Sequence, residues 1–235
     1  MRIVVVAGTD TGVGKTVVTA ALAALAGASG QRVAVVKPAQ TGVGPGEAGD
    51  LAEVRRLSGV VDLHELARFP APLAPASAAR HAGLIAPSVE ELATAILELG
   101  DRELVLIEGS GGLLVHLDDG GGTLADLASR LGAPVVVVTR AGLGALNASA
   151  LTCEALAARR IECLGLVIGA WPAHPDLASE SNLVDLPRYT ARPLLGRLPE
   201  GAGQMTPPAF LDVARAGLAP ALQECELLFP TRVGP

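Results

Sequence analysis

The chain has 235 residues, of which 50% are hydrophobic and only 2% aromatic, and its formal net charge is −6. This length suits a single large α/β domain, and the negative charge disfavours partners such as nucleic acid or an anionic membrane surface. No apolar run approaches the ~20 residues of a membrane span. Because Met1 leads straight into a predicted strand and three cysteines are too few for a disulfide framework, we expect a cytoplasmic enzyme without a secretory signal.

Apolar segments that resemble strands alternate along the chain with longer segments of helical spacing. The strand candidates are continuous Val, Ile and Leu runs, which is typical of strands buried on both faces, and they span residues 2–7, 32–37, 104–108, 134–139, 164–170 and 193–198. The helix candidates span residues 15–28, 51–58, 89–99, 124–131, 143–159 and 208–222. This alternation predicts a mostly parallel central sheet with helices on both faces.

Three further segments lack a clear period. Residues 69–79 are rich in Pro and Ala and are predicted to form a loop, and residues 172–185 are predicted to be rich in loops. We expect residues 223–235 to form a loosely held C-terminal tail, so that the predicted domain spans residues 1–222.

The first predicted strand leads into the stretch AGTDTGVGKT, residues 7–16. Its glycines let backbone N–H groups surround an anion, and the positive end of the following helix favours phosphate. Lys15 can reach the β- and γ-phosphates, and Thr16 can place its hydroxyl on Mg²⁺. The loop is one residue longer than usual, and Thr9 takes the place of a glycine. A plain glycine-rich turn is the weaker alternative, so we predict the phosphate loop of a P-loop NTPase fold.

Other reactive side chains follow the predicted strands, at the sheet edge where ligands bind in such folds. Lys37 ends the second strand, where a second cation could stabilise a transferring phosphoryl group, although a lone lysine is more often solvated. Glu108 ends the third strand, like the acidic residue that meets Mg²⁺ in P-loop enzymes; the alternative is a capping or surface carboxylate. For Asp50, local sequence favours a helix N-cap at least as much as a metal site.

The remaining candidates indicate no other chemistry. The four histidines are scattered without metal-ligand spacing, and no Gly-x-Ser-x-Gly elbow is present. Residues 118–122 are typical of a polar turn. Residues 143–147 open a helix that is otherwise apolar, and their composition predicts a packing surface, such as a subunit interface.

Three stretches taken together, GTDTGVGKT, KPAQTG and EGSGGLLV, resemble the dethiobiotin synthetase family, and the likeness runs from Met1 to about Ala202. The stretched phosphate loop is the form that this family carries. The resemblance implies a cyclo-ligase that forms carbon–nitrogen bonds in biotin synthesis. Its expected substrates are 7,8-diaminononanoate, CO₂ and ATP, its expected cofactor is Mg²⁺, and its expected assembly is a homodimer.

The implied reaction assigns roles to residues of this chain. One amine takes up CO₂ as a carbamate, the carbamate attacks the γ-phosphate, and the second amine closes the ring with release of phosphate. Lys15 and Lys37 are the expected catalytic cations, and Mg²⁺ is expected at Thr16, Asp50 and Glu108. The diamine is expected at Thr11, Lys37, Thr41 and Gly111. Its carboxylate tail is expected to reach the partner subunit, at the segment formed by Leu143, Gly144, Leu146 and Asn147.

The expected nucleotide-binding residues come from three parts of the chain. They are Asp10, Thr11, Gly12, Val13, Gly14, Lys15, Thr16, Val17, Gly169, Ala170, Pro199, Glu200, Gly201 and Ala202. Two positions depart from the family pattern. Ser110 replaces a more usual alanine, which is a small change. The stretch GAWP at 169–172 lacks the asparagine with which many relatives read adenine, so we expect loose selectivity for the nucleotide base.

Three alternatives compete with this interpretation. Switch ATPases of the partitioning type share the fold, but they carry an extra lysine in the phosphate loop where this chain has Asp10. Amide-forming ligases of corrinoid synthesis usually add a glutaminase domain, for which the chain is too short. A nucleotide-binding module without catalysis is disfavoured because Lys37 and Glu108 are both present.

Overall fold

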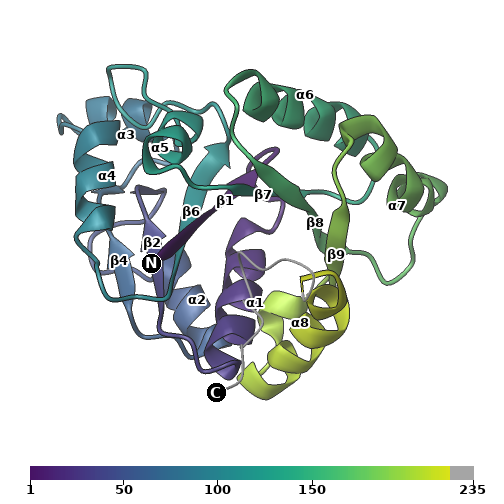
Figure 1. Ribbon diagram of the computed structural model, residues 1–235. Coiled ribbons are helices and arrows are strands. Elements are labelled where there is room, and N and C mark those ends of the chain that lie inside the picture. Colours follow the sequence, from purple (N-terminus) through teal and green to yellow (C-terminus); the bar gives the residue numbers. More distant parts are fainter. Residues whose placement is uncertain (223–235) are drawn as a thin grey trace.

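The computed structural model describes residues 1–222, except for the side chains of 219–221, so the predicted tail lies outside the described residues. A seven-stranded sheet has the order β4-β2-β6-β1-β7-β8-β9 (Figure 1). Each neighbouring pair in it is parallel. The strands are β1 (Arg2–Gly8), β2 (Val33–Lys37), β4 (Leu63–Glu65), β6 (Leu104–Gly112), β7 (Val135–Thr139), β8 (Cys163–Trp171) and β9 (Leu194–Pro199). The predicted parallel sheet is confirmed.

Helices cover both faces of the sheet, as predicted (Figure 1). One face carries α1 (Lys15–Ala28), α2 (Asp50–Ser58) and α8 (Pro207–Leu222). The other carries α4 (Val89–Leu97), α5 (Leu124–Leu131), α6 (Ala145–Ala158) and α7 (Leu177–Thr190). A second, two-stranded sheet joins β3 (Gln40–Thr41) to β5 (Arg68–Phe69), and α3 (Pro75–His81) packs beside it. No helix among residues 1–222 is long and apolar enough to cross a membrane.

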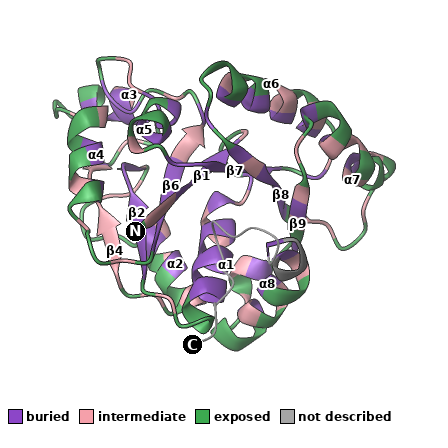
Figure 2. Ribbon diagram, viewed as in Figure 1, coloured by how far each residue is buried: buried purple, intermediate pink, exposed green. Residues whose placement is uncertain are grey.

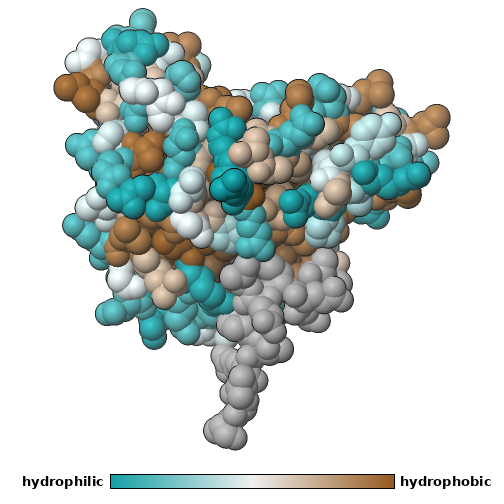
Figure 3. Space-filling model, turned by 45° about the horizontal axis from the view of Figure 1, so that its top comes forward, coloured by the Kyte–Doolittle hydropathy of each residue, from teal (hydrophilic) through white to brown (hydrophobic). Residues whose placement is uncertain are grey.

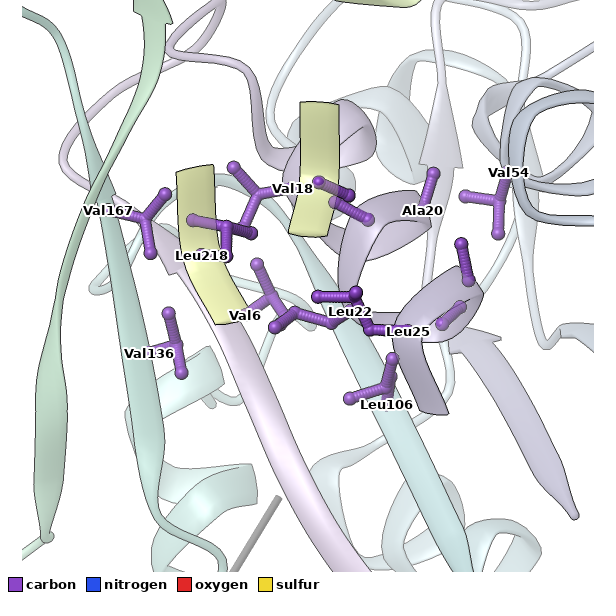
Figure 4. Close-up of a cluster of buried hydrophobic side chains, with 14 of the residues drawn as sticks. Val6, Val18, Ala20, Leu22, Leu25, Val54, Leu106, Val136, Val167 and Leu218 are labelled. Atoms are coloured by element: carbon purple, nitrogen blue, oxygen red, sulfur yellow. The ribbon is translucent and has the colours of Figure 1, made fainter. Parts of the chain in front are cut away.

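The central strands are buried on both faces because successive side chains point to opposite sides. In β1, Val4 and Val6 face the α1 side, whereas Val5 and Ala7 face the α5 side, and all four are at most 1% exposed. Figure 2 shows the inner strands in the colour of buried residues. Figure 4 shows how Val6 meets Leu22 of α1 and Leu218 of α8 in the same cluster. The apolar runs of the sequence therefore form a sheet enclosed between two helical layers.

Two segments expected to be loops contain helices, and those predictions were wrong. Residues 69–79 include the start of α3, which begins at Pro75, a position where proline is well tolerated. Residues 172–185 include the start of α7, whose N-cap Asp176 accepts a hydrogen bond from the N–H of Ser179 at 2.7 Å. The short strands β3, β4 and β5 were also missed, since pieces of two or three residues leave no periodic pattern.

The surface mixes apolar and polar side chains. Figure 3 shows hydrophobic residues reaching the surface between hydrophilic ones on the face that it presents. Among the large apolar side chains that are exposed, Leu143 is 84% exposed and Leu151 is 57% exposed. Leu143 lies in the segment 143–147 for which composition predicted an interface, and Leu151 lies one turn further along α6.

Candidate nucleotide and substrate site

The predicted phosphate loop connects β1 to α1 and rests on the end of β8. Gly14, the N-cap of α1, has a φ of 95°, and no side chain caps this helix, which leaves its first N–H groups for a ligand. A Cβ added to Gly169 would lie 2.1 Å from the carbonyl oxygen of Val13, and one added to Gly14 would lie 2.9 Å from that of Gly169. Glycine at both positions therefore lets two backbones touch and fixes the loop against the sheet.

Lys15 lies over this loop. Its Nζ donates a hydrogen bond to the carbonyl oxygen of Asp10 at 2.9 Å, and the residue is 8% exposed. Burial lowers the pKa of the Lys15 ammonium, and the nearby charge of Lys37 lowers it further, whereas Glu108 and Asp50 oppose the change. A lysine ammonium at the end of a phosphate loop is placed to reach the outer phosphates of a nucleotide.

Lys37 ends β2 inside a cluster of charges. Its Nζ lies 2.6 Å from Asp50 Oδ2 and 2.9 Å from Glu108 Oε1, and it also donates to the carbonyl oxygen of Gly109 at 3.2 Å. Lys37 is 2% exposed and Glu108 is fully buried. Burial alone would lower the pKa of Lys37, but the charges and hydrogen bonds of Glu108 and Asp50 outweigh it and raise this pKa. The alternative of a solvated lysine is therefore wrong, and Lys37 remains charged in a buried setting.

Glu108 also holds the predicted magnesium residue Thr16. Thr16 Oγ1 donates a hydrogen bond of 2.7 Å to Glu108 Oε1, while Glu108 Oε2 is buried with no hydrogen-bond partner among the described residues. Burial raises the pKa of the Glu108 carboxyl, and Lys37 and Thr16 oppose that rise. Glu108 is thus neither a cap nor a surface carboxylate.

The residues present fit a magnesium ion. Two carboxylates and one hydroxyl are hard oxygen donors, and Mg²⁺ commonly takes few protein ligands and completes its shell with water and phosphate oxygens. The orphaned Oε2 of Glu108 is a buried oxygen in need of a partner. Within residues 1–222, no group of three or more His, Cys, Asp or Glu side chains could hold a metal by itself.

Asp50 is not the N-cap that its local sequence equally favoured. Gly49 occupies the N-cap of α2, and the Asp50 side chain instead pairs with Lys37. The Asp50 N–H donates to Gln40 Oε1 at 2.8 Å, and Gln40 Nε2 donates to the carbonyl oxygen of Thr41. Gln40 is 3% exposed and was missed by sequence reasoning, although it stands within the quoted stretch KPAQTG.

A cavity of about 790 Å³ opens at these residues. Its walls include most of the residues predicted for the phosphates, the metal and the diamine, namely Thr11, Gly12, Gly14, Lys15, Thr16, Val17, Lys37, Thr41, Asp50, Glu108 and Gly111. The cavity is also lined by Gln40, Val115 and residues 72–75, which sequence reasoning missed, and by Ser110, which it named only as a departure from the family pattern. The Ser110 hydroxyl donates to the carbonyl oxygen of Ala39, so the departure from alanine ties the end of β6 to the loop after Lys37.

Other predicted residues lie outside this cavity. The segment with Leu143, Gly144, Leu146 and Asn147 forms the start of α6 and the turn before it. Of the residues expected to hold the base, Gly169 touches the phosphate loop, and the N–H of Glu200 donates to the carbonyl oxygen of Trp171 at 2.7 Å. That bond places the ends of β8 and β9 together, next to the loop.

Asp10 forms an ion pair with Arg140, a residue that the sequence analysis did not identify. Its Oδ2 lies 2.8 Å from Arg140 Nη2, and its Oδ1 accepts a hydrogen bond from the N–H of Thr11. Arg140 follows β7 directly, so a third cation stands at the phosphate loop. Val13 is 3% exposed and its side chain packs in the hydrophobic core, so only its backbone groups are available to a ligand at the loop.

Comparisons with known proteins show which family the chain resembles. A family model described as an AAA domain matches residues 2–207. The chain is 62% identical to a protein of Frankia casuarinae over 94% of both chains, and 62% identical to one of Saccharopolyspora erythraea over 94% of this chain and 97% of that one. A protein of Streptomyces coelicolor is 56% identical over 94% of both chains. All three are named ATP-dependent dethiobiotin synthetase BioD.

Solved structures share the fold at low sequence identity. The cell division ATPase MinD of Pyrococcus furiosus superposes with a TM-score of 0.58 at 19% identity, covering 95% of this chain and 99% of that one. The septum site-determining protein MinD of Pyrococcus horikoshii, solved with Mg-ADP, gives a TM-score of 0.58 at 19% identity, covering 92% and 95%. At such identity these likenesses concern the fold alone.

Proposed function

The chain belongs to the family of ATP-dependent dethiobiotin synthetases, so it is a cyclo-ligase of biotin biosynthesis, and we propose that its substrates are 7,8-diaminononanoate, CO₂ and ATP. One amine of the diamine adds to CO₂ and loses a proton, which gives a carbamate. A carbamate oxygen then attacks the γ-phosphorus of ATP and releases ADP. The second amine attacks the carbamoyl carbon, expels phosphate and closes the cyclic urea. The reaction requires ATP, so the cytoplasm is its natural setting.

The observation that carries this proposal is the position of Lys37. A buried ammonium at 2.9 Å from Glu108 lines the same cavity as Lys15 of the phosphate loop. Negative charge builds up on the carbamate and on the phosphoryl group during transfer, and a fixed cation in a dry site stabilises it strongly. In this proposal Lys15 binds the outer phosphates and Lys37 neutralises charge on the carbamate. Two separate cations in one cavity can thus stabilise both reacting groups.

We further propose that Mg²⁺ is held by Thr16, Asp50 and Glu108, where it would neutralise the β- and γ-phosphates. The unpartnered Glu108 Oε2 supports this assignment. In that arrangement Asp50 and Glu108 also keep Lys37 protonated and fix the direction of its ammonium.

The diamine end of the substrate is proposed to bind at Thr11, Thr41 and Gly111, which line the cavity. Its carboxylate tail would extend to the start of α6 in a second subunit, because Leu143, Gly144, Leu146 and Asn147 are absent from the cavity walls of their own chain. The exposure of Leu143 and Leu151 supports an interface there. The α6 N-terminus carries no side-chain cap, so its N–H groups suit a carboxylate.

The nucleotide is proposed to lie along Asp10–Val17 of the phosphate loop, with its base between Gly169–Ala170 and Pro199–Ala202. The contact between Gly14 and Gly169 supports this, because it brings the loop next to the ends of β8 and β9.

Phosphate release from MgATP tests the reaction, with and without 7,8-diaminononanoate and bicarbonate. Release that needs both compounds, with dethiobiotin identified by mass spectrometry, is the expected result. Release that is equally fast without the diamine would contradict the substrate assignment and favour a switch ATPase.

A further inference from the structure

Asn182 of α7 holds the turn that precedes α6. Its Nδ2 donates to the carbonyl oxygens of Ala141 at 2.6 Å and Gly142 at 3.0 Å, and the residue is 4% exposed. An amide nitrogen with two protons can satisfy two carbonyls at once. Asn182 therefore fixes two consecutive peptide groups of the connection between β7 and α6.

The start of α6 depends on that connection because no side chain caps it. Its N-cap is Gly144, with a φ of 86°, whereas the N-caps of α4, α5 and α7 are Ser88, Thr123 and Asp176, each of which accepts a backbone N–H. The N–H of Ala145 donates to Gly142 O at 3.3 Å, and this carbonyl is one of the two that Asn182 holds. The direction of the first turn of α6 is thus set largely by residues 141–144.

Helix α7, which carries Asn182, is itself held in place by a buried face. Its buried residues Ser179, Asn182, Leu186 and Thr190 are three or four positions apart and so lie on one face. Leu186 belongs to the core cluster that also contains Ala145 and Leu156 of α6. Figure 1 shows α6 and α7 next to each other at the same end of the sheet. A rigid face on α7 can therefore hold the α6 turn at a defined position.

We propose that Asn182 is a positioning residue for the diamine, because it orients the first-turn N–H groups of α6 toward the carboxylate tail of a substrate bound by the partner subunit. This inference rests on the proposed function, since it requires that substrate and that dimer. Asn182 itself touches no substrate; it acts through residues 141–144. A residue with a purely structural role would instead change the stability of the protein, and it would affect the KM for diamines with and without the carboxylate equally.

The test combines variants of Asn182 with a substrate that lacks the carboxylate. Asn182→Asp has almost the same size but replaces the donating nitrogen with an oxygen that repels both carbonyls. Thr190→Val is the matched control, because Thr190 is buried on the same face of α7, and its hydroxyl donates to Leu186 O and accepts from the N–H of Arg192, at the helix end away from the α6 turn. The substrates are 7,8-diaminononanoate and 2,3-diaminononane, in which a methyl group replaces the carboxylate.

For Asn182→Asp, the KM for 7,8-diaminononanoate is expected to rise about tenfold, the effect of losing a well-placed hydrogen bond at the tail. The KM values for MgATP and for 2,3-diaminononane should match those of the unmodified protein. Thr190→Val should change none of these constants. Equal changes for both diamines, or an unchanged KM for 7,8-diaminononanoate, would overturn the inference.

Asn182→Ser keeps the test decisive if the aspartate variant does not fold. Its single hydroxyl is shorter, so we expect a smaller rise in KM that is again confined to the substrate with a carboxylate; no rise overturns the inference. Failure of the proposed function is recognised separately, in the unmodified protein: without turnover that requires the diamine and bicarbonate, the inference falls together with that function. Normal turnover with unaffected Asn182 variants rejects the inference alone.

Discussion

Lys37 Nζ lies 2.9 Å from Glu108 Oε1, although the two residues are 71 positions apart in the chain. They meet because β2 and β6 are neighbours in the sheet, and their register pairs Val36 with Ile107, the residues just before Lys37 and Glu108. Both side chains are almost completely buried, so each charge depends on the other. Removal of one partner from a buried pair leaves an uncompensated charge, which makes this relationship a sensitive point for stability as well as for activity.

Lys37→Met is expected to reduce dethiobiotin formation by at least about a hundredfold, because a preorganised cation is lost from the reacting groups. The free energy of unfolding should also fall, by about 3–5 kcal/mol, since Glu108 is left unpaired. Denaturant unfolding and product formation measure the two effects. In the double variant with Glu108→Gln, stability should largely recover while activity stays low. A double variant as unstable as Lys37→Met would contradict the ion-pair explanation.

Gly169→Ala should weaken nucleotide binding. The new Cβ would lie 2.1 Å from the carbonyl oxygen of Val13 and would push the phosphate loop away from β8. We expect a rise in the KM for MgATP and a loss of about 1–3 kcal/mol of stability, typical of overpacking. Gly27→Ala is the control, because a Cβ at that position in α1 meets nothing within 4 Å. Since alanine favours helices, this control should equal or exceed the unmodified protein in stability.

Arg140→Ala should raise the KM for MgATP with little effect on stability. The Arg140–Asp10 pair is about half exposed, so it contributes at most about 1 kcal/mol to folding. Without Arg140, however, the unneutralised Asp10 carboxylate would repel a triphosphate bound at the loop as proposed. The effect should shrink at high ionic strength and should be reversed by Asp10→Asn in the same chain. Steady-state kinetics at low and high salt measure these effects. A KM for MgATP that stays raised when Asp10→Asn is combined with Arg140→Ala would contradict this explanation.

Gln40→Leu should raise the Mg²⁺ concentration needed for half-maximal phosphate release. The amide oxygen of Gln40 accepts the Asp50 N–H at 2.8 Å, and leucine removes this acceptor while keeping a similar volume. Asp50 would then be less firmly held at the proposed metal, which typically costs tenfold or more in metal affinity. Titration with Mg²⁺ at saturating ATP and diamine measures the change. An unaltered Mg²⁺ requirement would show that Gln40 does not position a metal ligand.

The nucleotide base is expected to be discriminated weakly. The proposed base site offers backbone groups of Gly169 and Ala170 and the turn at 199–202, which distinguish bases less well than an asparagine side chain would. Turnover with ATP, CTP and GTP at equal concentrations provides the comparison. Values of kcat/KM within about tenfold of one another support this expectation, and a strict requirement for ATP rejects it.

Much of the fold was predictable because its signals are local. A continuous apolar run such as Val4–Ala7 needs burial on both faces, and the only common way to provide it is a parallel sheet between helical layers. The phosphate loop is equally local, since Gly14, Lys15 and Thr16 are consecutive and their backbone direction follows from the strand before and the helix after. The rule that ligands bind at the carboxyl ends of strands then brought Lys37 and Glu108 to one edge.

The helix α7 shows where local signals fail. Its stretch contains Pro187 and many polar residues, so no apolar period marks it, and its helical form depends on the Asp176 cap and on burial of Asn182 and Leu186 against neighbours. The same limit applied to Asp50, for which a cap and a metal ligand are indistinguishable in sequence. In the structure Gly49 is the N-cap and Asp50 contacts Lys37 at 2.6 Å, which excludes the cap, whereas a metal at Asp50 stays a prediction.

The sequence by itself thus determined the class of fold, the phosphate loop and the reactive side chains at the strand ends, because each is encoded by residues adjacent in the chain. Only the tertiary structure decided which of these side chains touch, that two carboxylates neutralise Lys37, and how Gln40, Arg140 and Asn182 contact their partners. Those contacts join residues far apart in sequence, such as Asn182 and Ala141 at a separation of 41 positions. Such pairs depend on strand order and helix packing, which are global outcomes of burying the whole core at once.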